Sequence, residues 1–170
     1  RKPLVLLIDQ FEEIYTARRS QNPEALAMVE HTLKAMAQGG MVDHLAGGFH
    51  RYSTDQEWRI PHFEKMLYDQ AILARTYLEA YQITKNDFYA QVAREIFDYV
   101  LTDLQHAQGG FYSAEDADSV DPEESIGSSG RKKEGAFYVW RDKEIKNILG
   151  VKDAGIFSYY FGVMPDGNAP

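Results

Sequence analysis

Apolar residues recur three or four positions apart over long parts of this chain, which is the spacing of one helix face. The first such stretch predicts a helix over residues 22–38, with the apolar stripe Leu26, Val29, Leu33 and Met36. It begins with Asn22-Pro23-Glu24, a sequence typical of helix starts, and Gly39-Gly40 can end it.

A second helix is predicted from Pro61 to about Ile83. Its apolar residues lie on more than one side, as in a helix that is buried between neighbours. A third helix, capped by Asn86 or Asp87, is predicted to end at Gly109-Gly110. The pattern therefore predicts a mainly helical chain.

The rest of the pattern predicts one short β-hairpin and two shorter helices. Aromatic residues predict strands at about 111–113 and 136–140, which we expect to pair with each other. Asp142 is predicted to cap a helix over residues 143–149, and a last helix is predicted over residues 154–161.

One segment of the chain occurs twice. TLKAMAQGGMVDHLAGGFHRYSTD and IFDYVLTDLQHAQGGFYSAED each lead from a helix into Gly-Gly-Phe and then into polar and acidic residues. Gly47 and Gly109 are 62 residues apart, a period that equals two helices and their connections. The repeat predicts a helical array or toroid with both Gly-Gly-Phe loops on one rim.

The composition narrows the classes of function. A net charge of −8 argues against nucleic acid as a partner, because phosphate binding needs a basic surface. The lack of cysteine excludes disulfides and thiolate metal sites in this segment. No apolar run approaches the ~20 residues of a membrane span, and nothing resembles a signal peptide, so we expect a cytoplasmic protein. Because the chain begins with Arg1 rather than Met, we also expect a piece of a longer protein.

Residues 1–21 form a lead-in that the pattern does not assign. The apolar run over residues 4–8 ends at Asp9 and is similar to the Walker-B strand of signal-transduction ATPases, in which an Asp reaches Mg²⁺. The chain has no GxxxxGK[ST] phosphate-binding loop, which argues against nucleotide binding. The alternative is a helix that packs on the segment that follows.

Residues 47–69 concentrate the candidate chemistry, because histidines, arginines, acids and aromatic residues gather there in one turn-rich stretch. If a helix begins at Pro61, the side chains of His62, Lys65 and Asp69 share one stripe near its start. The helix dipole would keep His62 neutral there, which is the state of a general base. The alternative is a surface ion pair between Lys65 and Asp69.

His50 and Arg51 follow paired glycines, which let the backbone approach a ligand closely. The guanidinium of Arg51 can bind a carboxylate or a phosphate-like group, or it can instead pair with Asp55 or Asp69 inside the protein. Three aromatic residues can either stack on a sugar face or pack in the core: Tyr52, Trp58 and Tyr68.

Asp116 and Asp118, after the second Gly-Gly-Phe, have the spacing of metal-binding acids. An EF-hand loop would continue with an acid and a glycine where the chain has Val120 and Asp121, so we expect no metal and no other cofactor. We expect instead that one of these carboxylates acts as a general acid or base facing the first loop. Sugar chemistry by carboxylates needs two of them across a cleft.

Four blocks of the sequence carry a family resemblance: GGFHRYSTD, W-x-x-PHFEKMLYDQA, GGFYSAEDADS and EGAFYVW. In them the chain resembles the YyaL-type thioredoxin-domain-containing proteins, whose animal members are called spermatogenesis-associated protein 20. The resemblance implies an α/α toroid of the six-hairpin glycosidase type, of which residues 22–170 would be an incomplete segment. It also implies a thioredoxin-like domain in full-length members, which this chain lacks, and residues 120–133 look like an insertion.

The residues and the resemblance together predict a segment of a carbohydrate-active toroid, with a sugar-like ligand at the rim and glycosidase- or epimerase-like acid/base chemistry. The expected catalytic residues are His50, His62, Asp69, Asp116 and Asp118. The expected substrate-binding residues are Arg51, Tyr52, Asp55, Trp58, Glu64 and Lys65. The alternative is a non-catalytic helical scaffold that supports a thioredoxin-like domain or a protein partner.

Overall fold

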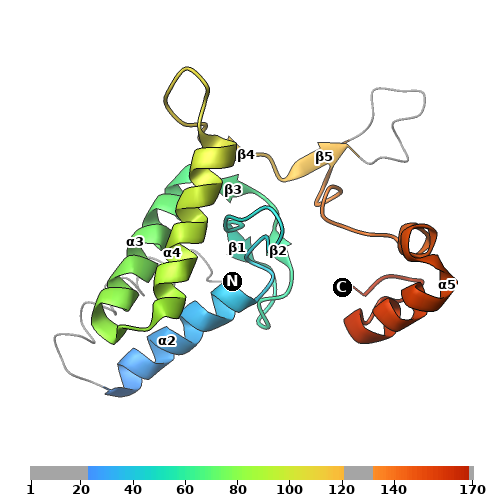
Figure 1. Ribbon diagram of the computed structural model, residues 1–170, viewed down its shortest axis with the longest axis horizontal. Coiled ribbons are helices and arrows are strands. Elements are labelled where there is room, and N and C mark those ends of the chain that lie inside the picture. Colours follow the sequence, from blue (N-terminus) through green and yellow to red (C-terminus); the bar gives the residue numbers. More distant parts are fainter. Residues whose placement is uncertain (1–22, 121–131, 169–170) are drawn as a thin grey trace. The chain divides into compact units, whose positions relative to one another are not determined.

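The computed structural model describes residues 23–120 and 132–168 (Figure 1). The predicted lead-in over residues 1–21 and most of the apparent insertion lie outside them. The chain divides into two compact units, Arg1–Asp118 and Ser119–Pro170. None of the described helices is long and apolar enough to cross a membrane.

The first described helix, α2, spans Pro23–Gln38, and its buried residues are those of the predicted stripe: Val29, Leu33 and Met36. The chain then passes very close to a neighbouring loop. The N–H of Gly40 donates a hydrogen bond to the carbonyl of Trp58 at 2.6 Å, and a side chain at Gly40 would collide with the backbone of Arg59. Glycine therefore follows α2 because only a bare backbone fits there.

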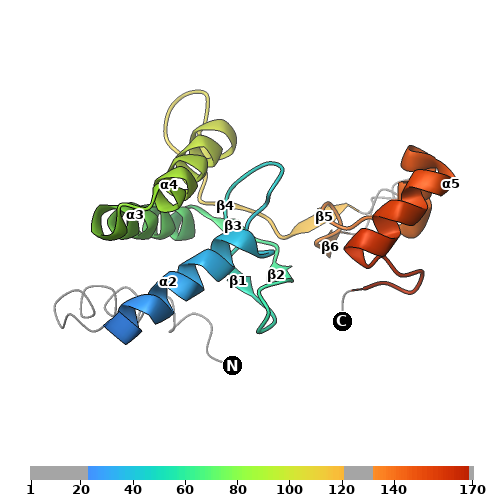
Figure 2. The same ribbon diagram turned by 60° about the horizontal axis from the view of Figure 1, so that its bottom comes forward.

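Two further helices, α3 over Leu67–Thr84 and α4 over Asp87–Tyr99, form an antiparallel pair and lie side by side (Figures 1 and 2). Lys85 takes a left-handed conformation, with φ of 59°, and ends α3. Asn86 accepts a hydrogen bond from the N–H of Phe88 and so caps α4, as predicted.

The first GGF loop (residues 47–49) and the second GGF loop (residues 109–111) have the same backbone form, as the repeat predicts. Their glycines have φ values of 85° and 78° in the first loop and of 93° and 78° in the second. The first phenylalanine forms a β-bridge with Val42 and the second with Gln105. Gln105 directly follows the π-helix η1, Val100–Leu104, which continues α4. The helix therefore ends before the two glycines and not at Gly109-Gly110, where it was predicted to end. The first phenylalanine is 2% exposed and the second 49%, so the same turn is packed differently.

The core of the first unit lies between α2 and the α3–α4 pair. Tyr77 of α3 is fully buried, and its hydroxyl donates a hydrogen bond to the carbonyl of Leu33 in α2 at 2.8 Å. Its ring lies 5.6 Å from the ring of Phe49 and 6.3 Å from that of Tyr89 in α4. One side chain of α3 thus contacts both neighbouring helices and the first GGF loop.

The first GGF loop is also held to α3 by a side-chain amide. Gln70 is fully buried, accepts a hydrogen bond from the N–H of Phe49 at 2.9 Å, and donates one to the carbonyl of Phe49 at 2.6 Å. Both backbone polar groups of this loop residue are therefore satisfied inside the core, where an unpaired group would be costly.

The prediction of a helix that begins at Pro61 is wrong. Strand β1, Tyr52–Ser53, pairs antiparallel with β2, Pro61–His62, and this hairpin lies at the C-terminal end of α2 (Figure 2). The helix begins only at Leu67. Pro61 is tolerated at the first position of a two-residue strand as it is at the first position of a helix, so the local signal does not separate the two.

Strand β3, Lys65–Met66, pairs with β4, Ala114–Glu115. The N–H of Leu67 also donates a hydrogen bond to the carbonyl of Ser113 at 2.9 Å. Because β4 follows the second GGF loop and β3 follows the first, this pairing brings the chain beyond each loop to one place. His62 and Lys65 therefore lie on strands, and only Asp69 lies on α3.

The predicted β-hairpin forms from other residues than expected. Strand β5, Asp118–Val120, pairs with β6, Lys132–Glu134. Residues 136–140 form no strand although their composition favours one. The physical reason is Gly135, which has φ of 71° and turns the chain directly after β6.

The second unit contains α5, Asp142–Phe161, which consists of two helical pieces that meet at Gly150. The angles at Gly150, φ of 73° and ψ of 165°, are not helical, so the helix is interrupted between the two predicted helices. Arg141 rather than Asp142 is the N-cap residue, and its N–H donates a hydrogen bond to the carboxylate of Glu144 at 2.8 Å.

Alanine substitutions at Gly48 and Gly110 test how tightly the first GGF loop packs. Both glycines have φ of 78°, so alanine strains the backbone equally at both, by about 1–2 kcal/mol. At Gly48 the added Cβ would lie 2.5 Å from the ring of Tyr99, whereas at Gly110 nothing lies within 4 Å. We expect Gly48→Ala to lower the free energy of unfolding by about 1–3 kcal/mol more than Gly110→Ala does, as measured by urea denaturation. Equal losses would contradict the packing of this loop on α4.

Candidate functional site

Lys65, on β3, is buried with 1% of its surface exposed. Its ammonium nitrogen lies 2.9 Å from Oδ2 of Asp43 and 2.9 Å from the carbonyl oxygen of Gly47. A carboxylate oxygen of Glu115 on β4 lies 3.8 Å away, and the ring of Tyr99 lies 4.7 Å away. Lys65, an expected substrate-binding residue, thus ties the first GGF loop to the strand that follows the second.

Asp43 is the main counter-charge of Lys65 and also shapes the turn that leads into the first GGF loop. Its Oδ1 accepts hydrogen bonds from the N–H groups of Leu45 and Ala46, each at 3.0 Å. Burial alone would raise the pKa of Asp43, but these hydrogen bonds and Lys65 hold the pKa below its ordinary value. The carboxylate is therefore ionised at neutral pH and fixes the turn and the lysine together.

His50 lies in the interior rather than at an open rim, with 2% of its surface exposed. Its Nδ1 lies 3.1 Å from the carbonyl oxygen of Phe63, and its ring meets the Phe63 ring edge-on at 5.4 Å. Burial, followed by the charge of Lys65, lowers the pKa of His50. The imidazole is therefore neutral and donates a hydrogen bond within the fold.

Asp55 organises the β1–β2 hairpin. Its carboxylate accepts hydrogen bonds from the N–H groups of Glu57, Arg59 and Ile60 at 2.7–3.0 Å. Burial opposes these bonds, yet the net effect lowers the pKa of Asp55. Trp58, in the same hairpin, has φ of 59° and packs partly buried against the core. The structure thus gives both predicted ligand-binding residues contacts within the protein.

Arg51 pairs with Glu64 close to several aromatic rings. The Nη1 of Arg51 lies 2.8 Å from Oε2 of Glu64, and Nε2 of His62 lies 3.7 Å from the same oxygen. The rings of Tyr52 and His62 stack at 4.9 Å, and the guanidinium of Arg51 lies 6.0 Å from the ring of Tyr68. These residues and Asp69 form what we call the Arg51–Asp69 cluster: Arg51, Tyr52, His62, Glu64, Tyr68 and Asp69.

Asp69, in the first turn of α3, is the unusual member of this cluster. It is 8% exposed, and its Oδ2 is buried without a hydrogen-bond partner among the residues that the structure describes. The Nε of Arg51 is buried and unpartnered in the same way. Burial raises the pKa of Asp69 to about 6, with Glu64 adding to the rise and Arg51 opposing it. A carboxyl with such a pKa can both take up and release a proton near neutral pH.

The two predicted acids of the second loop follow directly after β4. Oδ1 of Asp116 accepts a hydrogen bond from the N–H of Asp118 at 3.1 Å, and Asp118 begins β5. Glu115, on β4, accepts a hydrogen bond from the hydroxyl of Tyr99 at 2.8 Å, and its carboxylate lies 3.8 Å from the ammonium of Lys65. Sequence reasoning did not select Glu115, because only the pairing of β3 with β4 brings it there.

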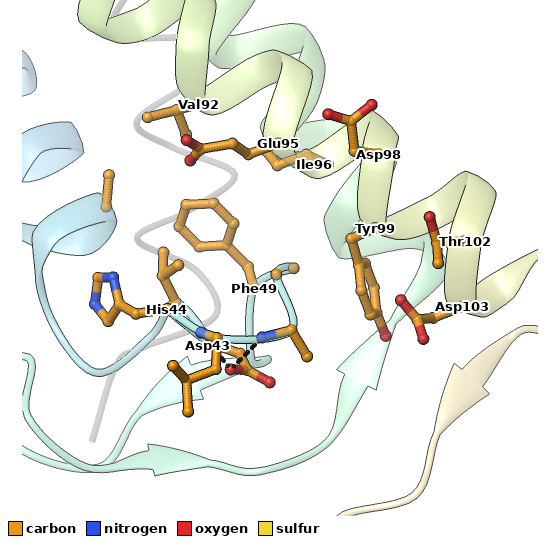
Figure 3. Close-up of a pocket in the computed structure, with 16 residues that line it drawn as sticks. Asp43, His44, Phe49, Val92, Glu95, Ile96, Asp98, Tyr99, Thr102 and Asp103 are labelled. Carbon is orange, nitrogen blue, oxygen red and sulfur yellow. Dashed lines mark hydrogen bonds between the residues drawn. The ribbon is translucent and has the colours of Figure 1, made fainter.

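A separate cavity of about 410 Å³ lies between the first GGF loop and α4. Figure 3 shows Asp103 beside the ring of Tyr99, Glu95 and Asp98 farther along α4, and His44 on the opposite side of the cavity. The sequence does contain a signal for this wall, since Glu95, Asp98 and Thr102 recur at helical spacing. None of the Arg51–Asp69 cluster lines this cavity. Within the described ranges, no group of three or more potential ligands is placed to hold a metal ion.

Comparison with known proteins gives close relatives but no matching family model. Over 125 residues the chain is 56% identical to spermatogenesis-associated protein 20 of Mus musculus and of Homo sapiens. Over 153 residues it is 44% identical to an uncharacterized protein of Caenorhabditis elegans. These matches cover 74% and 85% of the chain, but the chain spans only 15% of the mammalian relatives and 20% of the nematode one.

Among solved structures, the chain is similar to a family 76 glycoside hydrolase from a bovine Bacteroides thetaiotaomicron strain. The TM-score is 0.54, the sequence identity is 18%, and the match covers 89% of this chain and 29% of that one. At this identity the likeness shows the fold alone. It confirms the predicted fold class, a mainly α partial toroid built from helix pairs.

Replacing Lys65 tests the tie between the first GGF loop and β4. Lys65→Met leaves the Asp43 carboxylate, whose side chain is 8% exposed, without its counter-charge. We expect a loss of about 3–5 kcal/mol in the free energy of unfolding. Lys34→Met, which breaks an exposed pair with Glu30, is the control and should cost less than about 1 kcal/mol. In the double variant Lys65→Met with Asp43→Asn, part of the loss should be recovered. A loss no larger than that of Lys34→Met would refute the tie.

The variant Asp69→Asn tests whether burying the ionised carboxylate of Asp69 destabilises the protein, because that cost depends on pH. The folded-state pKa, about 6, lies above the ordinary value of 3.8, so the folded protein holds a proton that the unfolded chain releases. The stability that Asp69 contributes therefore falls as pH rises through this window and stays low above it. We expect Asp69→Asn to be more stable than the natural protein by about 1–3 kcal/mol near pH 8, with little difference near pH 4. Thermal unfolding across pH measures this, with exposed Asp153→Asn as control; a pH-independent difference would contradict the assignment.

Proposed function

The chain belongs to the family of spermatogenesis-associated protein 20, and from this premise we propose that it forms part of a carbohydrate-active toroid. The similarity to the fold of a glycoside hydrolase supports this class of ligand, and loops held by a rigid scaffold are where binding residues concentrate. The proposed ligand is sugar-like, and its place is the Arg51–Asp69 cluster.

One observation carries the proposal, namely the buried and unpartnered carboxyl of Asp69. Leaving a buried polar group without a partner costs roughly 1–3 kcal/mol, and native proteins do so rarely. Groups whose pKa is shifted by burial into the working range gather at functional sites. Asp69 therefore fits a residue whose partner is a ligand rather than the protein.

In the proposed chemistry Asp69 moves the proton. A carboxyl with a pKa near neutral acts as acid or base in either a hydrolysis or an epimerisation. Arg51, held by Glu64, orients the ligand, and His62 is positioned by its stack on Tyr52 and its approach to Glu64. Tyr68, which is 42% exposed, offers an aromatic face for a sugar ring.

A second candidate is a non-catalytic helical scaffold for a thioredoxin-like domain or a protein partner. The scaffold candidate is favoured because several of the predicted site residues make contacts within the protein. Lys65 pairs with Asp43, Arg51 pairs with Glu64, and the Asp55 carboxylate accepts backbone hydrogen bonds. A pure scaffold, however, has no use for the unpartnered carboxyl of Asp69.

A sugar panel on the full-length protein tests the proposal. Binding is read by thermal shift, and any sugar that binds is then followed for turnover. We expect Asp69→Asn to lower turnover by roughly 10²-fold or more, because the amide keeps the shape but cannot transfer a proton. His62→Ala should weaken activity less, and exposed Asp153→Asn should leave it unchanged. If no sugar binds, or if Asp69→Asn turns over normally, the scaffold candidate replaces this one.

A further inference from the structure

The charges around Asp69 leave one negative charge uncompensated. The charged groups that act on it are Arg51 and Glu64, which are themselves paired at 2.8 Å. Their fields oppose each other at Asp69, so the Arg51–Glu64 pair does little to neutralise a third charge. A ligand that carries a negative charge would meet two carboxylates and a guanidinium that is already engaged.

Two buried atoms without hydrogen-bond partners indicate which groups a ligand of this cluster should carry. When Asp69 is ionised its Oδ2 can only accept a hydrogen bond, and Nε of Arg51 can only donate one. A group that donates to the first and accepts from the second would satisfy both. A protonated amine beside a hydroxyl does this, since the ammonium donates to the carboxylate and the hydroxyl oxygen accepts from the guanidinium.

We propose that the Arg51–Asp69 cluster binds the vicinal amino-alcohol of an amino sugar, with the ammonium on Asp69 and the neighbouring hydroxyl on Arg51. This inference rests on the proposed sugar site and names its class of ligand; a bound ammonium would hold Asp69 in its ionised form, as the binding partner of that charge. A neutral sugar would supply the hydrogen bonds but not the charge, and a sugar acid or sugar phosphate would add a third negative charge. The side chains of Arg51 and Glu64 are 33% and 26% exposed, so this part of the cluster faces solvent.

The inference predicts an order of affinities that does not depend on knowing the natural substrate. Glucosamine, glucose, glucuronate and glucose 6-phosphate are titrated into the full-length protein near neutral pH, with calorimetry as the readout. We expect glucosamine to bind roughly tenfold or more tightly than glucose, because a charge-assisted hydrogen bond replaces a neutral one. Both anions should bind more weakly than glucose.

Variants test whether the preference for glucosamine over glucose arises at the Arg51–Asp69 cluster. Asp69→Asn should bring glucosamine and glucose to similar affinity, while Asp153→Asn should keep the preference. Glucosamine and glucose binding equally to the natural protein, or an anion binding tightest, would overturn the amino-sugar assignment and leave the sugar site standing. Failure of all four to bind would count against the sugar site itself, and the amino-sugar assignment would fall with it.

Discussion

The arrangement of the first unit depends on a positive charge placed inside it. A lysine ammonium can stay buried only if acceptors surround it, and at Lys65 these are the Asp43 carboxylate and the carbonyl of Gly47, with Glu115 nearby. Those partners come from the turn that begins at Asp43, from the first GGF loop and from β4. Burying the charge therefore requires that turn, the loop and β4 to be in place, and β3, which carries Lys65, leads directly into the helix on which Asp69 lies.

The sequence predicts the parts of this fold that short-range physics decides. The apolar stripe of α2, the Asn86 cap and the repeated Gly-Gly-Phe turn are local patterns, and each appears where expected. The prediction at Pro61 is wrong because the partners of that segment are distant in sequence: Ser53 pairs with Pro61, and Glu115 with Lys65. A two-residue strand has no periodicity from which a sequence can reveal it.

The candidate site was predictable in its composition but not in its geometry. Asp69 and Arg51 stand out in the sequence as polar residues in an aromatic stretch, and the structure places them in one cluster. Which charges neutralise one another follows from tertiary contacts alone. Lys65 pairs with Asp43 and Arg51 pairs with Glu64, whereas Oδ2 of Asp69 is buried without a hydrogen-bond partner among the residues that the structure describes.

The two hydrogen bonds between Gln70 and Phe49 have a consequence for how the protein behaves toward other copies of itself. A primary amide presents the same donor and acceptor as a peptide group, so the side chain of Gln70 stands in for one residue of a neighbouring strand. The N–H and C=O of Phe49, which would otherwise be an unpaired backbone donor and acceptor, are therefore both hydrogen-bonded inside the protein. At Phe49 the first GGF loop therefore offers no unpaired backbone group as a template for intermolecular β-pairing and aggregation.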